Sequence, residues 1–238
     1  MAGLTTVTAI PHAPTRHTHA RRTLWIAGFA HALHDGYTDL IYVLLPVWQT
    51  EFALGYGVLA FVRGLYTGTM AGLQIPVGRL AERYGGRVIL ALGTVLAAGG
   101  YALAGFSGGL GGLCVALALS GAGSSTQHPI ASAAVSRAYG GAARGALGIY
   151  NFTGDLGKAT VPAATAILLT LMPWRSALSV LAMLGIIVAL AIASLMPAFG
   201  QATTREAIKG QRHVGRGRGG FRCSLRLACW TARCEWAS

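Results

Sequence analysis

Six long apolar stretches follow one another along the chain, separated by short polar connections. They are Leu24–Trp48, Tyr56–Gly78, Val88–Phe106, Leu110–Val135, Gly145–Leu171 and Ser176–Pro197. Each is close to the roughly 20 residues that a helix needs to cross the hydrocarbon core of a bilayer. Because these stretches offer no polar face to water, a soluble helical bundle is not expected. The pattern predicts an all-α membrane protein with six transmembrane helices.

The composition agrees with lipid as the surroundings of most of the chain. Of the 238 residues, 53% are hydrophobic and only 11% are charged, and the mean hydropathy is positive. A soluble domain of this size carries roughly 25% charged residues. A chain with so little charge would not cover its outside with polar groups, so we expect most of it to lie in the bilayer.

The basic residues fall on alternate connections between the stretches. Bases precede the first stretch and follow the second and the fourth, namely Arg16, Arg21, Arg22, Arg79, Arg83, Arg87, Arg137 and Arg144. The opposite connections carry Glu51 and the single base Arg175. Since positively charged connections stay in the cytoplasm, this bias places the N-terminus there. Residues 1–23 lack the successive regions of a signal peptide and are interpreted as a short cytoplasmic lead.

Residues 198–238 form a basic tail that differs in character from the apolar region 24–197. Residues 201–238 hold 8 of the 19 Lys and Arg residues of the chain, and three of its four cysteines. Because they show no helical or strand period, the tail is predicted to be disordered. Gly215–Gly220 is too short to favour a nucleic-acid segment, and a polybasic lipid-surface patch is an alternative. The favoured interpretation is out-of-frame translation, because misread GC-rich codons yield Arg, Gly, Cys and Trp.

The first stretch holds four ionisable side chains at membrane depth, His31, His34, Asp35 and Asp39. A charge at the bilayer centre costs roughly 2.5–3.5 kcal/mol even on lenient insertion scales. Positions 31, 35 and 39 recur every four residues and His34 lies beside them, so one face of the helix is polar and must point into the protein. We expect this face to serve function rather than structural hydrogen bonds alone.

Three further stretches contribute candidate substrate- and proton-binding residues. These are Arg63 and Gln74, then Gln127 and His128, then Asn151, Asp155 and Lys158. Asp155 and Lys158 are three residues apart, so a neutralised structural ion pair and a functional pair both remain open. An anionic substrate would bind Arg63 and Lys158, whereas a proton would bind Asp35 or Asp39. The histidines also titrate near neutral pH.

Two backbone features stand out within the stretches. Pro129 lacks an N–H and clashes with the carbonyl four residues earlier, so it should distort its helix near Ser125. Gly64, Gly68 and Gly72 recur every four residues, a spacing that favours close packing against another helix.

The connection after the second stretch reads GRLAERYGGR, from Gly78 to Arg87. It resembles the loop signature of the major facilitator superfamily, G-x-x-x-(D/E)-R-x-G-(R/K)-(R/K), which lies between helices 2 and 3 on the cytoplasmic side. The matching residues are Gly78, Glu82, Arg83, Gly85 and Arg87, and the sequence departs at Gly86, where a base is usual. The resemblance implies that Glu82 and Arg83 help to hold a cytoplasmic gate against the second half of a transporter.

A closer likeness covers about Leu24–Leu171. The segments HALHDGYTDLIYVLLPVWQTEF, GLYTGTMAGLQIPVGRLAERYGGR, GSSTQHPIASAAVSRAY and ALGIYNFTGDLGKATVPA resemble the fosmidomycin-resistance subgroup of that superfamily. The resemblance implies a fold of two six-helix halves, of which this chain holds the N-terminal one. It also implies export of a small phosphonate anion by proton antiport across the bacterial inner membrane.

Three classes of function remain open at this point. The chain is a transporter half, either truncated and inactive alone or paired with a second half; an intramembrane enzyme; or a non-transporting membrane scaffold. Because it contains no HExxH-type metal pair and no nucleophile motif, no enzymatic activity, metal ion or cofactor is expected. The expected partners are the lipid bilayer, a small anionic substrate, protons and a second half, with no nucleic acid.

Overall fold

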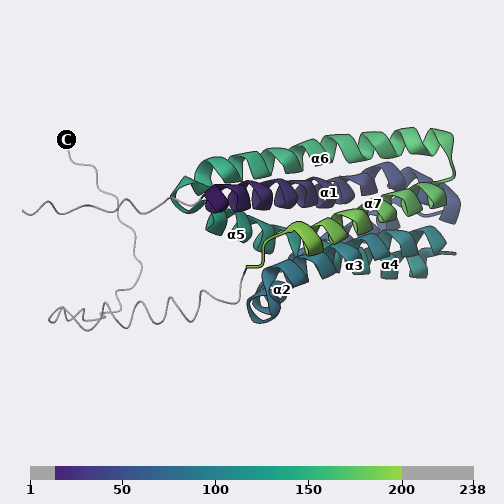
Figure 1. Ribbon diagram of the computed structural model, residues 1–238. Coiled ribbons are helices and arrows are strands. Elements are labelled where there is room, and N and C mark those ends of the chain that lie inside the picture. The colour runs from purple at the N-terminus through teal and green to yellow at the C-terminus, as the bar shows by residue number, and fades with distance from the viewer. Residues whose placement is uncertain (1–13, 200–238) are drawn as a thin grey trace, which may run out of the picture. The chain divides into compact units, whose positions relative to one another are not determined.

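The computed structural model describes residues 14–199, and their side chains from residue 17 onward. Within this range the chain is all-helical, with no strand (Figure 1). The elements are α1 Pro14–Phe52, α2 Tyr56–Tyr84, α3 Gly86–Phe106, α4 Leu110–Ser124, α5 Gln127–Tyr139, the 3-10 helix η1 Gly140–Ala142, α6 Ala143–Leu171 and α7 Trp174–Leu195. The basic tail lies outside the described residues.

Two helices extend well beyond the apolar stretches that predicted them. Helix α1 begins at Pro14, ten residues before the predicted start, so much of the predicted lead is helical. Proline suits the first helical position because its missing N–H would have no partner there. Helix α2 continues past Gly78 to Tyr84. These extensions are polar, which is why hydropathy did not find them.

The predicted distortion near Pro129 is confirmed as a short break in the fourth apolar stretch. Helix α4 ends at Ser124, and α5 begins at Gln127. The Ser125 N–H still donates to the Gly121 carbonyl at 3.0 Å. The Thr126 N–H donates to the Gly123 carbonyl, three residues earlier, at 3.3 Å. The helical ladder then restarts, so one stretch becomes two short helices with polar residues at their junction.

Helices α1 and α6 pack against each other more extensively than any other pair (Figure 1). A Cβ added to Gly28 would lie 3.1 Å from Thr153 Oγ1, one added to Gly157 would overlap the Ala32 carbonyl, and one added to Gly36 would overlap Val161. The contacts advance by four residues on both helices, so α1 and α6 run parallel. Small residues therefore allow close backbone approach along this interface.

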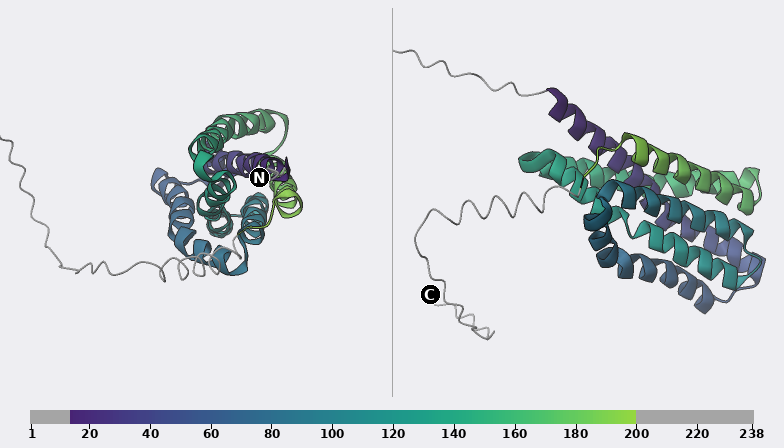
Figure 2. Two further views of the ribbon diagram at one scale, coloured as in Figure 1. Left: turned by 60° about the vertical axis from the view of Figure 1, so that its left-hand side comes forward. Right: turned by 60° about the horizontal axis from the view of Figure 1, so that its bottom comes forward.

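The remaining helices form a second group around α3, which packs on α4 and α7, while α2 packs on α4. Figure 2 shows α2 and α6 on opposite sides of the bundle. The predicted packing of Gly64, Gly68 and Gly72 is not found within residues 14–199, because a Cβ added at any of them would meet nothing within 4 Å. This face of α2 is open in the described part of the chain.

The core consists of two apolar clusters at different depths along α1. One cluster includes Leu24, Ala27 and Ala30, and the other runs from Leu33 to Trp48. The buried polar residues His31, His34 and Asp35 lie where the two clusters meet. The apolar packing of α1 thus holds a polar layer between its two halves.

The outer faces of the bundle are apolar, with large exposed side chains such as Leu184, Ile187 and Leu190 on α7. By length and composition alone, two helices of the described region, α3 and α7, qualify as membrane spans. Helices α4 and α5 are separately too short to qualify, at 15 and 13 residues. In α1, α2 and α6 ionisable residues interrupt the apolar sequence.

Candidate functional site

Asp35 is the centre of a charged cluster built from three helices. Its buried carboxylate lies 3.3 Å from His31 Nε2 on the same helix, 3.6 Å from His128 Nε2 on α5, and 3.2 Å from Lys158 Nζ on α6. Lys158 also contacts Asp155 Oδ1 at 3.4 Å. The predicted Asp155–Lys158 pair is therefore present, but Lys158 shares its charge between two carboxylates.

The local backbone explains how these side chains meet. His128 lies in the first turn of α5, directly after the break at Ser125–Thr126. Gly154 on α6 faces His31, and a Cβ there would come within 2.6 Å of His31 Cε1 and 2.9 Å of Asp35 Oδ2. The absence of a side chain at Gly154 leaves room for the two ionisable groups between α1 and α6.

His31 is held by a residue that sequence patterns did not single out. Its Nδ1 lies 2.9 Å from the backbone oxygen of Tyr150, and the Tyr150 ring stacks on the imidazole at 4.1 Å between centroids. Gln127 Nε2 donates to the Tyr150 hydroxyl and to the Ala27 carbonyl, both at 3.4 Å. Tyr150 has an apolar body and a polar tip, so hydropathy alone assigns it to the core.

His34 belongs to a separate hydrogen-bond chain, although its neighbour Asp35 lies in the charged cluster. Its Nε2 lies 3.0 Å from Thr94 Oγ1 and its Nδ1 lies 3.3 Å from Ser124 Oγ. Thr94 donates to the Leu90 carbonyl, and the Tyr66 hydroxyl donates to Ser124 Oγ at 3.0 Å. Each ring nitrogen has one partner, so a neutral His34 is fully satisfied here.

Arg63 on α2 has two buried nitrogens without a hydrogen-bond partner in the described region and contacts two aromatic rings. Its guanidinium carbon lies 4.8 Å from the centre of the Tyr42 ring and 5.9 Å from that of Tyr66. Its Nε and Nη1 are buried and have no hydrogen-bond partner among the described residues. A buried donor without a partner is costly, which makes this guanidinium ready to accept an anion.

Three other candidates are not drawn into the cluster. The side chains of Asp39, Gln74 and Asn151 make no hydrogen bond or ion pair with any residue between 14 and 199. Asp39 and Gln74 are half-buried, whereas Asn151 is exposed. The four-residue period predicted that Asp39 shares a face of α1 with Asp35, but no cation among the described residues forms an ion pair with it.

The predicted cytoplasmic loop is almost entirely helical. Glu82 and Arg83 lie in the last turns of α2, and Arg87 lies in the first turn of α3. The two helices are joined by Gly85 alone, with φ 95° and ψ 131°. This left-handed φ is readily adopted only by glycine, which explains the glycine of the signature at this position.

The departure at Gly86 also has a structural reason. A Cβ there would overlap the Phe199 ring, and the Gly86 N–H donates to the Phe199 carbonyl at 3.0 Å. Arg87 Nη1 donates to the Met196 carbonyl at 3.3 Å. The segment that follows α7 thus packs where a longer side chain of the signature would lie.

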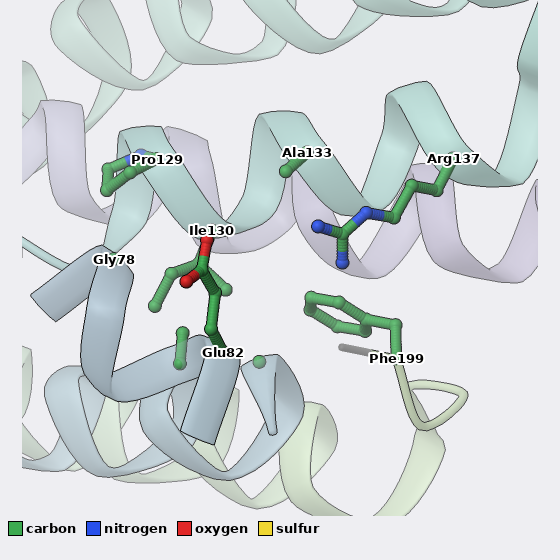
Figure 3. A pocket seen from close by; sticks show the side chains of 9 residues that line it. Gly78, Glu82, Pro129, Ile130, Ala133, Arg137 and Phe199 are labelled. Carbon is green, nitrogen blue, oxygen red and sulfur yellow. The ribbon is translucent and has the colours of Figure 1, made fainter. Parts of the chain in front are cut away.

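A cavity of about 240 Å³ lies at this end of the bundle. Figure 3 shows Phe199 and Arg137 among the side chains that line it. The cavity is lined by Gly78, Ala81, Glu82, Gly86, Pro129, Ile130, Ala133, Arg137 and Phe199. None of the charged residues around Asp35 lines it. The cavity therefore belongs to the loop signature rather than to the charged cluster.

At the end of the bundle opposite to the α2–α3 joint, Arg175 contacts the ends of two other helices. Its Nη2 donates to Glu51 Oε1 at 3.0 Å, and its Nη1 donates to the carbonyls of Gly105 and Ser107 at 2.9 and 2.8 Å. The two residues that sequence analysis placed outside the cytoplasm therefore pair with each other. This clamp links the ends of α1 and α3 to the start of α7.

Comparison with known proteins shows the family to which the chain belongs. The family model described as Major Facilitator Superfamily matches residues 24–232. The chain belongs to the Major Facilitator Superfamily. It is also similar to the fosmidomycin resistance protein of Escherichia coli (strain K12), with 31% identity over 155 residues, which are 64% of this chain and 38% of that protein.

Solved transporters of known structure share the fold. A bacterial homologue of the human lysosomal transporter Spinster, in an inward-facing and unoccupied conformation, matches with a TM-score of 0.63 and 17% identity. A peptide transporter in complex with alafosfalin matches with a TM-score of 0.62 and 17% identity. The match covers 85% and 84% of this chain, but 50% and 48% of those proteins.

This chain therefore spans about half the length of the transporters that it matches, and less of the fosmidomycin resistance protein. Membership of the superfamily makes it a membrane protein with the helical architecture of transporters. The family match extends beyond the described residues to residue 232, into the basic tail. The interpretation of that tail as out-of-frame stays a prediction.

Proposed function

We propose that the chain forms one half of a proton-coupled exporter of small anions in the bacterial inner membrane. In this proposal α4 and α5 together make one span, so six spans cross the bilayer and the N-terminus is cytoplasmic. The alternating basic connections support the orientation. The transporter family and the transporter neighbours favour transport over catalysis.

The observation that carries the proposal is the unpartnered guanidinium of Arg63. Two of its nitrogens are buried without a hydrogen-bond partner in the described part of the chain. A planar guanidinium matches the oxygens of a carboxylate, phosphate or phosphonate, and such charge-assisted bonds are strong. An anionic substrate would satisfy both nitrogens and offset the cost of burying them.

Lys158 offers a second cationic group to the same substrate. It is about half-exposed, and it contacts the carboxylates of Asp35 and Asp155 at once. An anion that takes over the ammonium would loosen the link between α1 and α6, because Asp35 and Lys158 lie on these two helices. Substrate binding is thereby coupled to the contact between them.

We assign proton transfer to Asp39, one turn beyond Asp35 and three residues before Tyr42, whose ring lies against Arg63. Asp39 makes no ion pair within residues 14–199, so no pair must break when a proton binds or leaves. Its charge acts on an anion held by Arg63, because opposite and like charges interact strongly where water is scarce. Proton and substrate are thus linked electrostatically.

Transport by this chain needs a second six-helix half to close the substrate path. The half is supplied either by further sequence of the same protein or by a separate chain. The open face of α2, including Gly64 and Gly68, leaves a surface on which such a half can pack. A chain without a second half would be a non-transporting membrane protein, which remains the alternative.

The test is proton-driven flux in proteoliposomes that contain the chain and a second half, with fosmidomycin as the probe. The unaltered pair is expected to move the drug when a pH gradient is imposed, and Asp39→Asn should lose that flux. Glu51→Gln, at the C-terminal end of α1, serves as the matched carboxylate control. Equal flux in Asp39→Asn and the unaltered protein would refute the assignment of the proton.

A further inference from the structure

Three side chains around Asp35 have the composition and spacing of a metal site. His31 Nε2, His128 Nε2 and a carboxylate oxygen of Asp35 lie within 4.8 Å of one another. Ligands at about 2.0–2.2 Å from a tetrahedral Zn²⁺ are separated by about 3.3 Å. The distances from the Asp35 carboxylate agree with this spacing, at 3.3 Å from Oδ2 to His31 Nε2 and 3.6 Å from Oδ1 to His128 Nε2.

The hydrogen bond of His31 fixes which nitrogen faces Asp35. Because Nδ1 lies 2.9 Å from the Tyr150 carbonyl, which only accepts, Nδ1 carries the hydrogen. In the neutral ring Nε2 then presents a lone pair. A backbone carbonyl on the far nitrogen is the usual second partner of a metal-binding histidine.

The near nitrogen of His31 lacks a partner of its own. The side chain is 6% exposed, and Nε2 forms no hydrogen bond with the described residues. In the neutral ring it faces Asp35 Oδ2 at 3.3 Å, so two electron-rich atoms are opposed beside the Lys158 ammonium, which lies 3.2 Å from the same oxygen. A cation between them removes this repulsion, and a third ligand atom, His128 Nε2, is directed at the same carboxylate.

His128 provides access to the site. Its side chain is 45% exposed, and its ring meets that of His31 edge-on, with centroids 5.2 Å apart and an angle of 87°. It lies at the start of α5, beside the break in the helix. An ion can therefore reach the buried pair on α1 from the exposed side chain of His128.

Lys158 is the competing cation. Its ammonium lies 3.2 Å from Asp35 Oδ2, but Asp155 Oδ1 at 3.4 Å offers it another partner. When Lys158 turns to Asp155, the charge of Asp35 is free for an ion. Two imidazoles and one carboxylate suit Zn²⁺, Co²⁺, Ni²⁺ or Cu²⁺ far better than Mg²⁺ or Ca²⁺.

We propose that His31, Asp35 and His128 together bind a divalent transition-metal ion of the Zn²⁺ type. The site goes beyond the proposed transport function and stands on its own geometry. Its test measures binding rather than flux, so either proposal can fail without the other.

The experiment titrates Zn²⁺ and Co²⁺ into the purified full chain in detergent, by calorimetry and by the visible absorption of Co²⁺. The tail cysteines Cys223, Cys229 and Cys234 are replaced by serine in all samples, so that thiols do not bind the probe. We expect one ion per chain, with nitrogen- and oxygen-ligand absorption. Helix content and elution volume verify that each variant is folded.

Variants of the proposed ligands and of nearby residues then test whether these side chains bind the ion. His128→Ala and Asp35→Asn should weaken Zn²⁺ binding at least tenfold, whereas His19→Ala, on the exposed first turns of α1, should not. Lys158→Met should tighten binding, since it removes the competing ammonium. His128→Cys should shift the preference from Zn²⁺ towards Cd²⁺, because thiolate is a softer ligand.

Unchanged Zn²⁺ affinity in folded His128→Ala would overturn the proposal, as would binding that disappears in His19→Ala. Weaker rather than tighter Zn²⁺ binding in Lys158→Met would also contradict the proposal. It would mean that Lys158 supports the cluster structurally and does not compete with the ion for Asp35. Loss of Zn²⁺ binding in His128→Ala together with Cd²⁺ preference in His128→Cys would establish His128 as a ligand.

Discussion

Gly154 lies against the His31 imidazole so closely that a methyl group on Gly154 would approach Cε1 to 2.6 Å and Nε2 to 2.8 Å. This contact belongs to the interface of α1 and α6, where His31 and Asp35 are buried. The geometry of the cluster therefore depends on a residue that carries no chemistry of its own.

Gly154→Ala is expected to destabilise the protein by about 1–3 kcal/mol, the usual cost of overpacking a filled interior. Thermal unfolding in detergent measures the effect. Gly148→Ala on the same helix is the matched control, because a Cβ there meets nothing within 4 Å. The control should be neutral or stabilising, since alanine favours helix over glycine by about 1 kcal/mol. Equal midpoints for the two variants would contradict this packing.

Gly86→Arg restores the basic residue that the superfamily signature usually has, yet we expect it to destabilise the chain. The new side chain would displace the Phe199 ring. In the double variant with Phe199→Ala the arginine should be tolerated, so the two changes should couple in a double-mutant cycle. Additive shifts in the unfolding midpoint would show that Phe199 does not occupy this place.

Arg63→Met should raise the thermal midpoint of the protein without ligand, because it removes two buried donors that lack partners among the described residues. It should also abolish the rise in midpoint that a bound phosphonate causes in the unaltered chain. Arg79→Met, an exposed position near the end of the same helix, is the control for loss of charge. A lower midpoint for Arg63→Met would mean that Arg63 stabilises the fold instead.

Arg175→Gln should cost about 1–2 kcal/mol, because Arg175 donates to two carbonyls as well as to Glu51. Glu51→Gln should cost less than about 1 kcal/mol, since the ion pair is partly exposed and screened by salt. Thermal unfolding at low and high salt separates the two effects. The cost of Arg175→Gln should persist at high salt, and its disappearance would assign the clamp to the ion pair alone.

Local sequence patterns predicted much of the fold. The apolar stretches gave the helices, and Pro129 gave the break, because both depend on residues close together in the chain. Polar helix ends such as Pro14–Thr23 escaped prediction, since hydropathy does not distinguish a polar helix from a polar connection. The joint at Gly85 also depends on a backbone angle that composition does not show.

The candidate site was predicted only in part, for a different reason. Asp35, His128 and Lys158 were singled out as ionisable groups within apolar stretches, but their meeting depends on the register of α1, α5 and α6. His34 and Asp35 are adjacent in sequence yet join different networks, because their side chains diverge around the helix. Tyr150 was missed, since it contacts His31 through a backbone carbonyl and a ring that hydropathy assigns to the core.

The four-residue recurrence of contacts between α1 and α6 has a mechanical consequence. Gly28, Ala32 and Gly36 each contact a residue of α6 at the same offset in sequence, so the parallel helices interlock once per turn. A slide of less than one turn, about 5.4 Å, would drive backbone into side chain. A motion that preserves these contacts would therefore move α1 and α6 together as one rigid unit, with the change in packing at their contacts with the other helices.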